Sequence, residues 1–347
     1  MSSSGNPQKP RVDRNHRPQH YEGYLNIEEP VMEVIPLSDN KFGAEIRGLD
    51  LGQLTNRVFS ELYEVFLTYG FFLIRNQLLD EHQQVEFGQR FGTLEFGALP
   101  LANQIKQPDG NYTDVFAMDS HRMLVNRGNE AWHTDSTYWP VSSKCAMLTA
   151  VKVPAEGGQT ELADARAGYA DLPEELRGRI QDRSAYHSTQ YSQAKDLQHY
   201  PEQKADSIYH GEAYLRPLVK VHPETGRPNL MVGRHAFGVP GLSRSESREL
   251  IESLTDFVVS DPARVYTHQW QVGDTLVWDN RALLHRARPY DYQQPRVLIG
   301  TRIKGDVPSE LAYYPDDSAA EAGRAALSAE LACLRSEVKS ADGQLAS

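Results

Sequence analysis

Apolar and polar residues first alternate in the run VMEVIPL at residues 31–37, as they do in a half-buried strand. Residues 55–68 instead repeat their apolar positions at helical spacing, and Gly70 favours the end of that helix because glycine tolerates a left-handed turn. The apolar run GFFLIRNQ that follows predicts a short, deeply buried strand, and a second helix is expected over 80–90. The ordered part of the chain is therefore predicted to begin with strand, helix, strand and helix.

Short strand-like runs dominate the rest of the chain, and turn-forming residues separate them. These runs cover residues 145–153, 159–165, 214–222, 227–233, 275–280, 283–288 and 296–305. Helices are expected at 166–182 and 243–258. Many short strands favour a mainly β core, of sandwich or barrel type, with flanking helices. No GxGxxG or GxxxxGKS/T loop occurs, which argues against a Rossmann or P-loop nucleotide enzyme.

Composition divides the chain into three segments. Residues 1–30 are polar, basic and Pro-rich, and they predict a disordered N-terminal arm. Residues 31–315 are expected to form one domain. The final segment, residues 316–347, predicts an amphipathic helix that either docks on its own domain or forms a contact in a homo-oligomer. Four apolar residues share one face of that helix: Leu327, Leu331, Leu334 and Val338.

Two segments are predicted to form lids over a site. Residues 95–130 are rich in Gly, Pro, Asn and Asp and predict a long loop, and loops of that length are usually functional or mobile. Residues 187–212 contain Tyr, His and Gln side chains that can shape a polar or aromatic pocket. A solvated insertion explains the composition of this second segment equally well.

Charge and cysteine content exclude several classes of protein. The chain of 347 residues carries 36 Lys+Arg against 47 Asp+Glu, and its net charge of −11 repels a nucleic-acid backbone. Two cysteines rule out a disulfide scaffold. No run approaches the ~18 apolar residues of a membrane helix, and the N-terminus lacks the apolar stretch of a secretory signal. We expect a cytoplasmic protein that acts on a small molecule, with no nucleic-acid or membrane partner.

A candidate metal site begins in the run AWHTDS, where His133 and Asp135 stand two residues apart. In an extended segment both side chains share one face and can chelate one divalent ion. By itself this pair also fits a surface ion pair. His285 lies in a later apolar strand, and a hairpin through PYDYQQP would place Arg296 opposite it. Two imidazoles and one carboxylate match the facial triad of non-haem Fe(II) oxygenases, and a guanidinium can grip a dicarboxylic cosubstrate beside it.

Six blocks of sequence, in one order, resemble the taurine dioxygenase and chlorophenoxyacetate dioxygenase family of Fe(II)/2-oxoglutarate-dependent oxygenases. The resemblance runs from about Gly43 to Gly305, roughly three-quarters of the chain. The blocks are GAEIRGLDL; FFLIRNQ with QRFGTLE; WHTDSTY; KVPAEGGQTELADARAGYADLP; RPLVKVHPETGR; and GDTLVWDNRALLHRARPYD. The resemblance implies a double-stranded β-helix, or jelly-roll, core.

The same resemblance assigns roles to individual residues. The iron ligands would be His133, Asp135 and His285. Thr160 and Arg296 would hold the far carboxylate of 2-oxoglutarate, and Trp278 would pack beside this cosubstrate. Asn129 would face the primary substrate. Each assignment has a structural alternative: a strand hydroxyl for Thr160, a core aromatic for Trp278 and a turn residue for Asn129.

The chain departs from the family pattern at Gly300, where members that act on sulfonates or aryloxyacetates tend to carry a second arginine. Arg302 shares a strand face with Arg296, but the span between them is about 20 Å, too far to replace that arginine without a bulge. This departure argues against taurine and, less strongly, against a simple aryloxyacetate. Gly300 would also leave room for a bulkier group. Other cations that can bind a substrate anion are Arg234, His235 and Lys195.

The resemblance predicts an enzyme that uses Fe(II), 2-oxoglutarate and O2. It would hydroxylate an aliphatic C–H bond, or cleave the substrate when that carbon bears a heteroatom, and release succinate and CO2. The carboxylate of Asp135 argues against halogenation, because halogenating relatives lack it. Two alternatives remain open: Zn(II) on the same ligands could activate water for hydrolysis, or the protein could be a non-catalytic metal-binding sensor. Zinc hydrolysis leaves Arg296 without a role, and the intact ligand set argues against a degenerate sensor.

Overall fold

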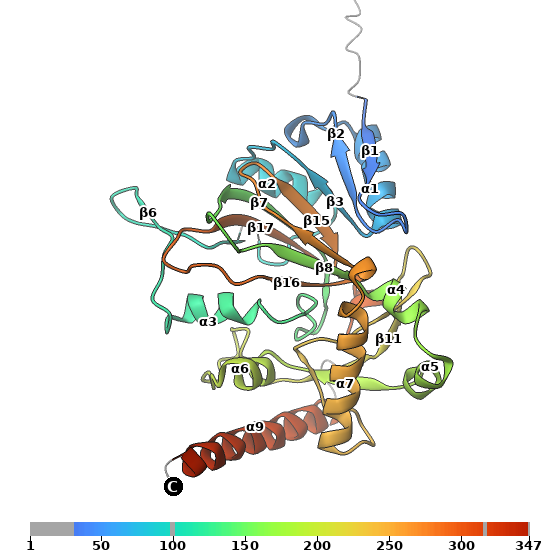
Figure 1. Cartoon of the computed structure of the whole chain (residues 1–347), viewed down its shortest axis with the longest axis vertical. Helices are drawn as coiled ribbons and strands as arrows, with labels where there is room; N and C mark the ends of the chain where they lie inside the picture. Colours follow the sequence, from blue (N-terminus) through green and yellow to red (C-terminus); the bar gives the residue numbers. More distant parts are fainter. Residues whose placement is uncertain (1–30, 98–100, 315–317, 346–347) are drawn as a thin grey trace, which may run out of the picture. The chain divides into compact units, whose positions relative to one another are not determined.

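Seven strands form the main sheet of the protein (Figure 1). The computed structural model describes residues 31–97, 101–314 and 318–345. The strand order is β1 (Glu33–Pro36), β2 (Ala44–Arg47), β3 (Phe71–Ile74), β15 (Thr275–Asp279), β7 (Ser143–Lys152), β17 (Val297–Lys304) and β4 (Leu101–Ala102). Only β2 and β3 run parallel, and the other neighbours are antiparallel. All four residues of β3 are buried, as the apolar run there predicts.

A second sheet has the order β14 (Val265–His268), β8 (Thr160–Asp164) and β16 (Leu283–Ala287), all antiparallel. Figure 1 shows β8 and β16 beside the main sheet. Three smaller sheets complete the β structure: β10 (Tyr214–Pro217) with β9 (Ser184–His187) and β13 (Ala236–Phe237), β11 (Val219–Val221) with β12 (Pro228–Leu230), and β5 (Ile105–Lys106) with β6 (Tyr112–Thr113). The prediction of a mainly β core with flanking helices is confirmed.

The predicted N-terminal helices are present, and they cover the main sheet. Helix α1 (Asn56–Tyr69) is capped by the Thr55 side chain, and it ends at Gly70, whose φ of 78° is left-handed. Helix α2 (Glu81–Gln89) starts with a capping box on Asp80. The buried face of α1 joins one hydrophobic cluster with strands of the main sheet. The remaining helices are α3 (His121–Gly128), α4 (Ala165–Ala170), α5 (Glu174–Ile180), α6 (Thr189–Leu197), α7 (Arg244–Val259), α8 (Val307–Glu310) and α9 (Ser318–Leu345).

Three predicted elements are wrong in their extent. The helix expected over 166–182 is two helices, α4 and α5, because Pro173 caps the second and prevents continuation. The strand expected over 214–222 is likewise two strands that belong to different sheets. The loop expected over 95–130 contains β4, β5, β6 and α3. These elements are short, so they give little periodicity to a sequence pattern.

The two ends of the chain had separate predictions. The predicted N-terminal arm, residues 1–30, lies outside the described residues. The predicted C-terminal helix is α9, and its buried leucines pack against Tyr191 of α6 and Phe237 of β13. Its apolar face is thus covered by its own domain, and the homo-oligomer contact stays a prediction. Among the described residues, no helix is both long and apolar enough to span a bilayer.

Candidate active site

His133, Asp135 and His285 form a buried cluster. Each offers one ligand atom, and these atoms lie within 4.8 Å of one another. The two histidines come together because their backbones form an isolated antiparallel bridge, with N to O distances of 3.0 and 2.8 Å. Thr134, between His133 and Asp135, donates its hydroxyl to the Leu283 carbonyl of β16 and fixes the two segments further. The residues predicted as a metal triad therefore lie side by side.

Two predictions about the backbone that brings these residues together are wrong. The segment after His133 does not continue as a strand: Asp135 lies in a turn, and Ser136 adopts a left-handed φ of 58°. The hairpin expected between His285 and Arg296 is also absent, because β16 pairs with β8 whereas β17 pairs with β7. The connecting segment crosses from one sheet to the other. Arg296 thus reaches the site from the opposite sheet.

The electrostatics of the cluster suit a divalent cation. Burial lowers the pKa of both His133 and His285, so the rings are neutral and could serve as metal ligands. The Ala131 carbonyl lies 2.8 Å from Nδ1 of His133, which directs the proton to Nδ1 and leaves Nε2 free. Burial would raise the pKa of Asp135, but the nearby Arg302 cation outweighs this effect and the pKa is lowered. Its Oδ2 has no hydrogen-bond partner among the described residues. Two nitrogens and one carboxylate oxygen fit Fe(II).

A cavity of about 500 Å³ opens beside this cluster. The five other predicted site residues all line it: Asn129, Thr160, His235, Trp278 and Arg296. Tyr138 and Gln193 line it too, although the sequence reasoning did not single them out. Tyr138 belongs to the block WHTDSTY and was within reach of that reasoning. Gln193 lies on α6, in a segment without apolar periodicity, and had no signal.

Arg296 and Thr160 form one end of the cavity. The Arg296 Nε donates to the Gly158 carbonyl at 2.9 Å, and burial lowers the pKa of Arg296 to about 10. No ion pair of the described residues involves Arg296, so its charge lies buried without a carboxylate. Gly158 has a φ of 68°, and a Cβ there would lie 3.0 Å from the arginine side chain, so glycine keeps this space open. The Thr160 hydroxyl accepts from Trp270 Nε1 at 3.1 Å. An unpaired buried cation fits the carboxylate of a dicarboxylic acid.

Trp278 connects the cluster to the turn between β15 and β16. Its ring centroid lies 4.8 Å from that of His285. Its Nε1 donates to Asn280 Oδ1 at 3.1 Å, and Asn280 Nδ2 donates to Ser143 Oγ at 3.2 Å. The conformation of this turn therefore sets the orientation of the indole and, through it, one wall around His285.

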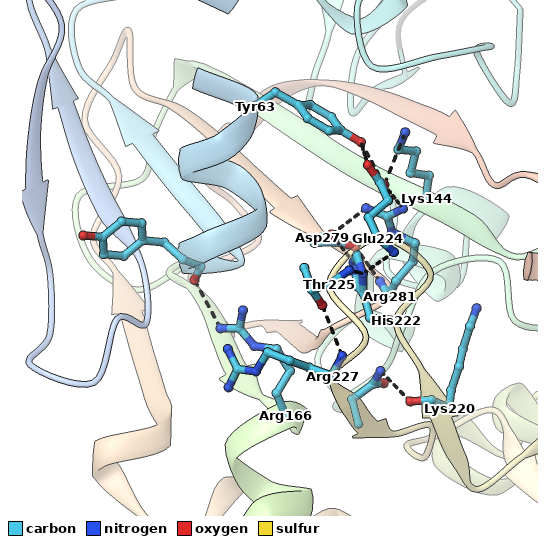
Figure 2. A network of polar contacts seen from close by, with 12 residues as sticks. Tyr63, Lys144, Arg166, Lys220, His222, Glu224, Thr225, Arg227, Asp279 and Arg281 are labelled. Atoms are coloured by element: carbon cyan, nitrogen blue, oxygen red, sulfur yellow. Dashed lines mark hydrogen bonds and ion pairs between the residues drawn. The ribbon is translucent and has the colours of Figure 1, made fainter. Parts of the chain in front are cut away.

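Figure 2 shows the polar network that holds this turn. Asp279 accepts from Arg281 Nε and Nη2 at 2.9 and 2.8 Å, and it lies 3.0 Å from His222 Nε2. Arg281 also donates to Glu224, which accepts from the Tyr63 hydroxyl of α1 at 2.9 Å. The network ties the 279–281 turn to α1 and to the turn between β11 and β12. Since β16 begins two residues later, it fixes the strand that carries His285.

The three side chains proposed to replace the arginine missing at position 300 differ in their position and charge. Lys195 pairs with Glu252 at 2.7 Å and is not among the described residues that line the cavity. His235 lines the cavity, but burial lowers its pKa well below the usual value and its Nδ1 lies 2.9 Å from Ser192 Oγ, so it is a neutral ring. Arg234 lines the cavity and pairs through Nε with Asp196 at 2.8 Å. Its buried Nη2 has no hydrogen-bond partner among the described residues.

Two expectations concern β17. Gly300 lines the cavity, and a Cβ there would lie 3.0 Å from the Leu148 side chain and 3.4 Å from the Leu101 carbonyl, two residues that line the cavity as well. The expectation that Gly300 leaves room for a bulkier group stays a prediction. Arg302 was expected to lie too far from Arg296 to replace the missing arginine without a bulge. Strand β17 has a register irregularity between Val297 and Leu298, and Arg302 Nη2 lies 2.6 Å from Asp135 Oδ1. Arg296 and Arg302, which lie six residues apart in the sequence, both line the cavity.

Comparisons with known proteins agree with this geometry. The family model described as "Taurine catabolism dioxygenase TauD, TfdA family" matches residues 33–302. A (S)-phenoxypropionate/alpha-ketoglutarate dioxygenase of Sphingobium herbicidovorans is 42% identical over 288 residues, which cover 82% of this chain and 98% of the relative. A protein of the same description from Delftia acidovorans is 43% identical over 273 residues, covering 76% and 92%. The crystal structure of AAD-2 in complex with Mn(II) and N-oxalylglycine matches with a TM-score of 0.73 at 31% identity, covering 80% of this chain and 98% of that one.

Proposed function

The chain belongs to the taurine catabolism dioxygenase TauD, TfdA family, and on that premise we propose that its substrates are small aryloxyalkanoic acids. It is an Fe(II)- and 2-oxoglutarate-dependent dioxygenase, an oxidoreductase that converts 2-oxoglutarate to succinate and CO2. When bound, the iron activates O2 for the oxidation of an aliphatic C–H bond. The observation that carries the proposal is the meeting, in one cavity, of the His133, Asp135 and His285 cluster with buried arginines.

In the proposed site, His133, Asp135 and His285 hold the iron. Their support is the close approach of three buried ligand atoms and the unpartnered Asp135 Oδ2. Arg296 binds the far carboxylate of 2-oxoglutarate, since a buried cation without an ion pair needs an anion. Thr160 adds its hydroxyl, and Trp278 packs beside the cosubstrate. The alternative function, a zinc hydrolase, would leave Arg296 without a role.

Arg234 is proposed to bind the carboxylate of the organic acid. Its Nε is held by Asp196, so the guanidinium is oriented, and its Nη2 remains an unused buried donor at the cavity wall. Gly128, the last residue of α3, packs against this guanidinium, and any larger side chain at that position would collide with it. Asn129, next in sequence, lines the same wall. A fixed donor of this kind favours an anionic acceptor over a neutral one.

The rest of the wall suits an apolar group. Several aliphatic and aromatic side chains line the cavity: Phe96, Leu101, Val125, Met147, Leu148, Ile208 and Leu298. The combination of one anion-binding donor and an apolar wall matches an aryl ring joined to a short carboxylic acid. The two named relatives act on (S)-phenoxypropionate, which has these two parts.

The chemistry of such a substrate predicts its products. Hydroxylation replaces the hydrogen on the carbon between the carboxylate and the ether oxygen. The resulting hemiketal collapses: the C–O bond to the aryl group breaks, the hydroxyl proton passes to the leaving oxygen, and a phenol and a 2-oxo acid form. For 2-phenoxypropionate these products are phenol and pyruvate, beside succinate and CO2. The fold that supports this site is proposed to be a jelly roll, built from the seven-stranded sheet and the β14–β8–β16 sheet.

A coupled-turnover assay tests the proposal. Succinate and phenol are measured with Fe(II), ascorbate, 2-oxoglutarate and, in turn, both enantiomers of 2-phenoxypropionate, phenoxyacetate, taurine and an alkyl sulfate. We expect at least one aryloxy acid to give equal amounts of succinate and phenol, and taurine to give none. A panel in which only taurine or the sulfate stimulates succinate formation contradicts the proposal. His133→Ala should lose bound iron, and anaerobic ester hydrolysis by the zinc-loaded protein would favour the hydrolase instead.

Replacing the proposed anion anchor gives a sharper test. Arg234→Gln should lower kcat/KM for the aryloxy acid by roughly 10- to 150-fold, the value of a hydrogen bond to a charged group. The KM for 2-oxoglutarate should stay at its wild-type value. Arg179→Gln, on the exposed surface of α5, is the matched control. An unchanged kcat/KM in Arg234→Gln would remove this residue from the substrate site.

A further inference from the structure

Arg302 makes an unusual contact for a residue at a substrate pocket, because it binds a metal ligand. Its Nη2 lies 2.6 Å from Asp135 Oδ1, and its Nη1 donates to Ser136 Oγ at 3.3 Å. The guanidinium carbon lies 5.4 Å from the centroid of the Phe96 ring. Both terminal nitrogens of Arg302 are thus engaged by residues next to, or belonging to, the proposed triad. Arg234, in contrast, keeps a terminal nitrogen free.

The two oxygens of Asp135 have different environments. Oδ1 is held by Arg302, whereas Oδ2 has no hydrogen-bond partner among the described residues and lies 3.5 Å from His285 Nε2. Oδ2 therefore points toward the histidine ring that would share the metal. We propose that Arg302 is a positioning residue for the metal, because it holds one oxygen of Asp135 so that the carboxylate presents only the other.

Neighbouring residues hold Arg302 in place. The Ser136 hydroxyl donates to Glu95 Oε1, and the Glu95 backbone N–H donates to the Arg302 carbonyl at 2.9 Å. Ser136 reaches this position from a left-handed backbone conformation, with a φ of 58°, that is uncommon for a non-glycine residue. The Arg302 guanidinium therefore lies near the Asp135 and Glu95 carboxylates and the Ser136 hydroxyl, which belong to two separate segments of the chain. These contacts fix the position of the Asp135 carboxylate.

The consequence concerns coordination number. A divalent ion held there by two imidazoles and a single carboxylate oxygen would keep three positions for other ligands. A chelating cosubstrate would take two of them, and the second oxygen of Asp135 would compete for the third. By holding Oδ1, Arg302 would leave that position available, an inference that rests on the proposed metal site.

Metal binding without turnover tests this role. Co(II) alone is titrated calorimetrically into metal-free wild type, Arg302→Gln and Arg302→Lys, and the visible spectrum of each complex is recorded. We expect Arg302→Gln to lose at least about 10-fold in Co(II) affinity, because the Asp135 ligand is no longer oriented. Its Co(II) spectrum should also change, because both Asp135 oxygens become available. Arg302→Lys keeps the positive charge but loses the two terminal nitrogens of the guanidinium, so its Co(II) affinity should be intermediate. Arg75→Gln is the matched control, since Arg75 pairs with Asp274 at 2.7 Å outside the cavity-lining residues.

The outcomes separate the possible roles of Arg302. Wild-type Co(II) affinity and spectrum in Arg302→Gln, together with a raised KM for the organic acid, would overturn the proposal and make Arg302 a substrate anchor. Wild-type values throughout would overturn it as well. If Arg302→Gln fails to fold, the comparison of Arg302→Lys with wild type decides. Equal Co(II) binding by wild type and His133→Ala would instead contradict the metal site itself.

Discussion

The Arg296 guanidinium lies inside the protein with one hydrogen bond to a carbonyl and no carboxylate partner among the described residues. Such a charge is costly to bury unless an anion compensates it. We expect Arg296→Gln to raise the KM for 2-oxoglutarate by roughly 10- to 150-fold, because a hydrogen bond to a charged group is lost. Initial rates at varied 2-oxoglutarate measure this effect. The KM of Arg296→Lys for 2-oxoglutarate should lie between those of wild type and Arg296→Gln.

The KM for the organic substrate provides the internal control for Arg296. It should change little, since Arg234 and not Arg296 is proposed to bind that acid. An Arg296→Gln enzyme whose KM for 2-oxoglutarate equals the wild-type value would show that another residue binds the cosubstrate. Equal losses for both acids would indicate a general collapse of the cavity.

At the residue scale, the sequence predicts well those positions whose chemistry depends on residue type and order. His133, Asp135, His285 and Arg296 are of this kind, and the structure brings them to one cavity. The contacts of Arg302 were not predictable from spacing. Two residues that are far apart along one strand can still line the same cavity, because the extent of the cavity also depends on the second sheet.

At the element scale, α6 and α9 show why the outer wall of the cavity was harder to predict. The leucines of α9 recur at helical spacing, so the helix was predicted. Helix α6 has little apolar periodicity, yet six of its nine residues are buried. Helix α9 covers one side of α6, and Gln193 of α6 lines the cavity on another. Polar residues buried by two different neighbours leave no one-sided pattern.

Gly323 of α9 offers a test of that packing. A Cβ at this position would lie 2.5 Å from the Ala213 carbonyl, and a backbone atom cannot move aside cheaply. Gly323→Ala should therefore push α9 outward, loosen α6 and its Asp196–Arg234 ion pair, and raise the KM for the organic acid several-fold. The expected loss of stability is about 1–3 kcal/mol, typical of overpacking. Urea denaturation and initial rates measure the two effects.

Gly178 provides the matched control for Gly323. It also lies in a helix, α5, but a Cβ there would meet nothing within 4 Å. Gly178→Ala should stabilise the protein by up to about 1 kcal/mol, because alanine is the better helix former. If Gly323→Ala behaves like Gly178→Ala, with a gain in stability and no change in KM, the close approach of α9 to β10 has no role in the cavity wall.

The turn between β15 and β16 has its own prediction, which can be followed in Figure 2. Asp279 and Arg281 are each buried, and Asp279 also contacts His222 at 3.0 Å. Asp279→Asn removes the buried one of the two carboxylates that compensate Arg281, the other being Glu224, and breaking a buried pair in this way typically costs 3–5 kcal/mol. Urea denaturation of the metal-free protein measures the loss. Asp39→Asn, at an exposed carboxylate, should change stability by less than about 1 kcal/mol, and an equally small loss in Asp279→Asn would refute the argument.

At the scale of the whole molecule, an acidic chain of net charge −11 concentrates positive charge around one cavity. Arg234, Arg296 and Arg302 all line it, and 2-oxoglutarate and the proposed aryloxy acid are both anions. The sequence predicted the mainly β class and most strands. It did not predict which sheet each strand joins, because the pairings of β16 with β8 and of β17 with β7 join residues more than a hundred positions apart.

Buried histidines give the whole molecule a predictable response to acid. His187 of β9 is 1% exposed, and neither ring nitrogen has a hydrogen-bond partner among the described residues. Burial, together with the nearby Arg216 cation, lowers the pKa of His187 to about 3. Burial also lowers the pKa values of other histidines: His133, His199, His210, His235 and His285. Since these groups are protonated more readily in the unfolded chain, acid favours unfolding.

The sign and size of the effect follow for His187. Between an unfolded pKa near 6.5 and the folded value, the unfolded chain binds a proton that the folded protein does not. The free energy of unfolding therefore falls as the pH drops below about 6.5, by ~1.4 kcal/mol per pH unit for this one group. His187→Leu should make the decline shallower by about that amount, as urea denaturation of the chelator-treated protein at several pH values would show. His82→Leu, at an exposed histidine of α2, is the control. If wild type and His187→Leu lose stability in parallel, His187 is not buried as a neutral ring.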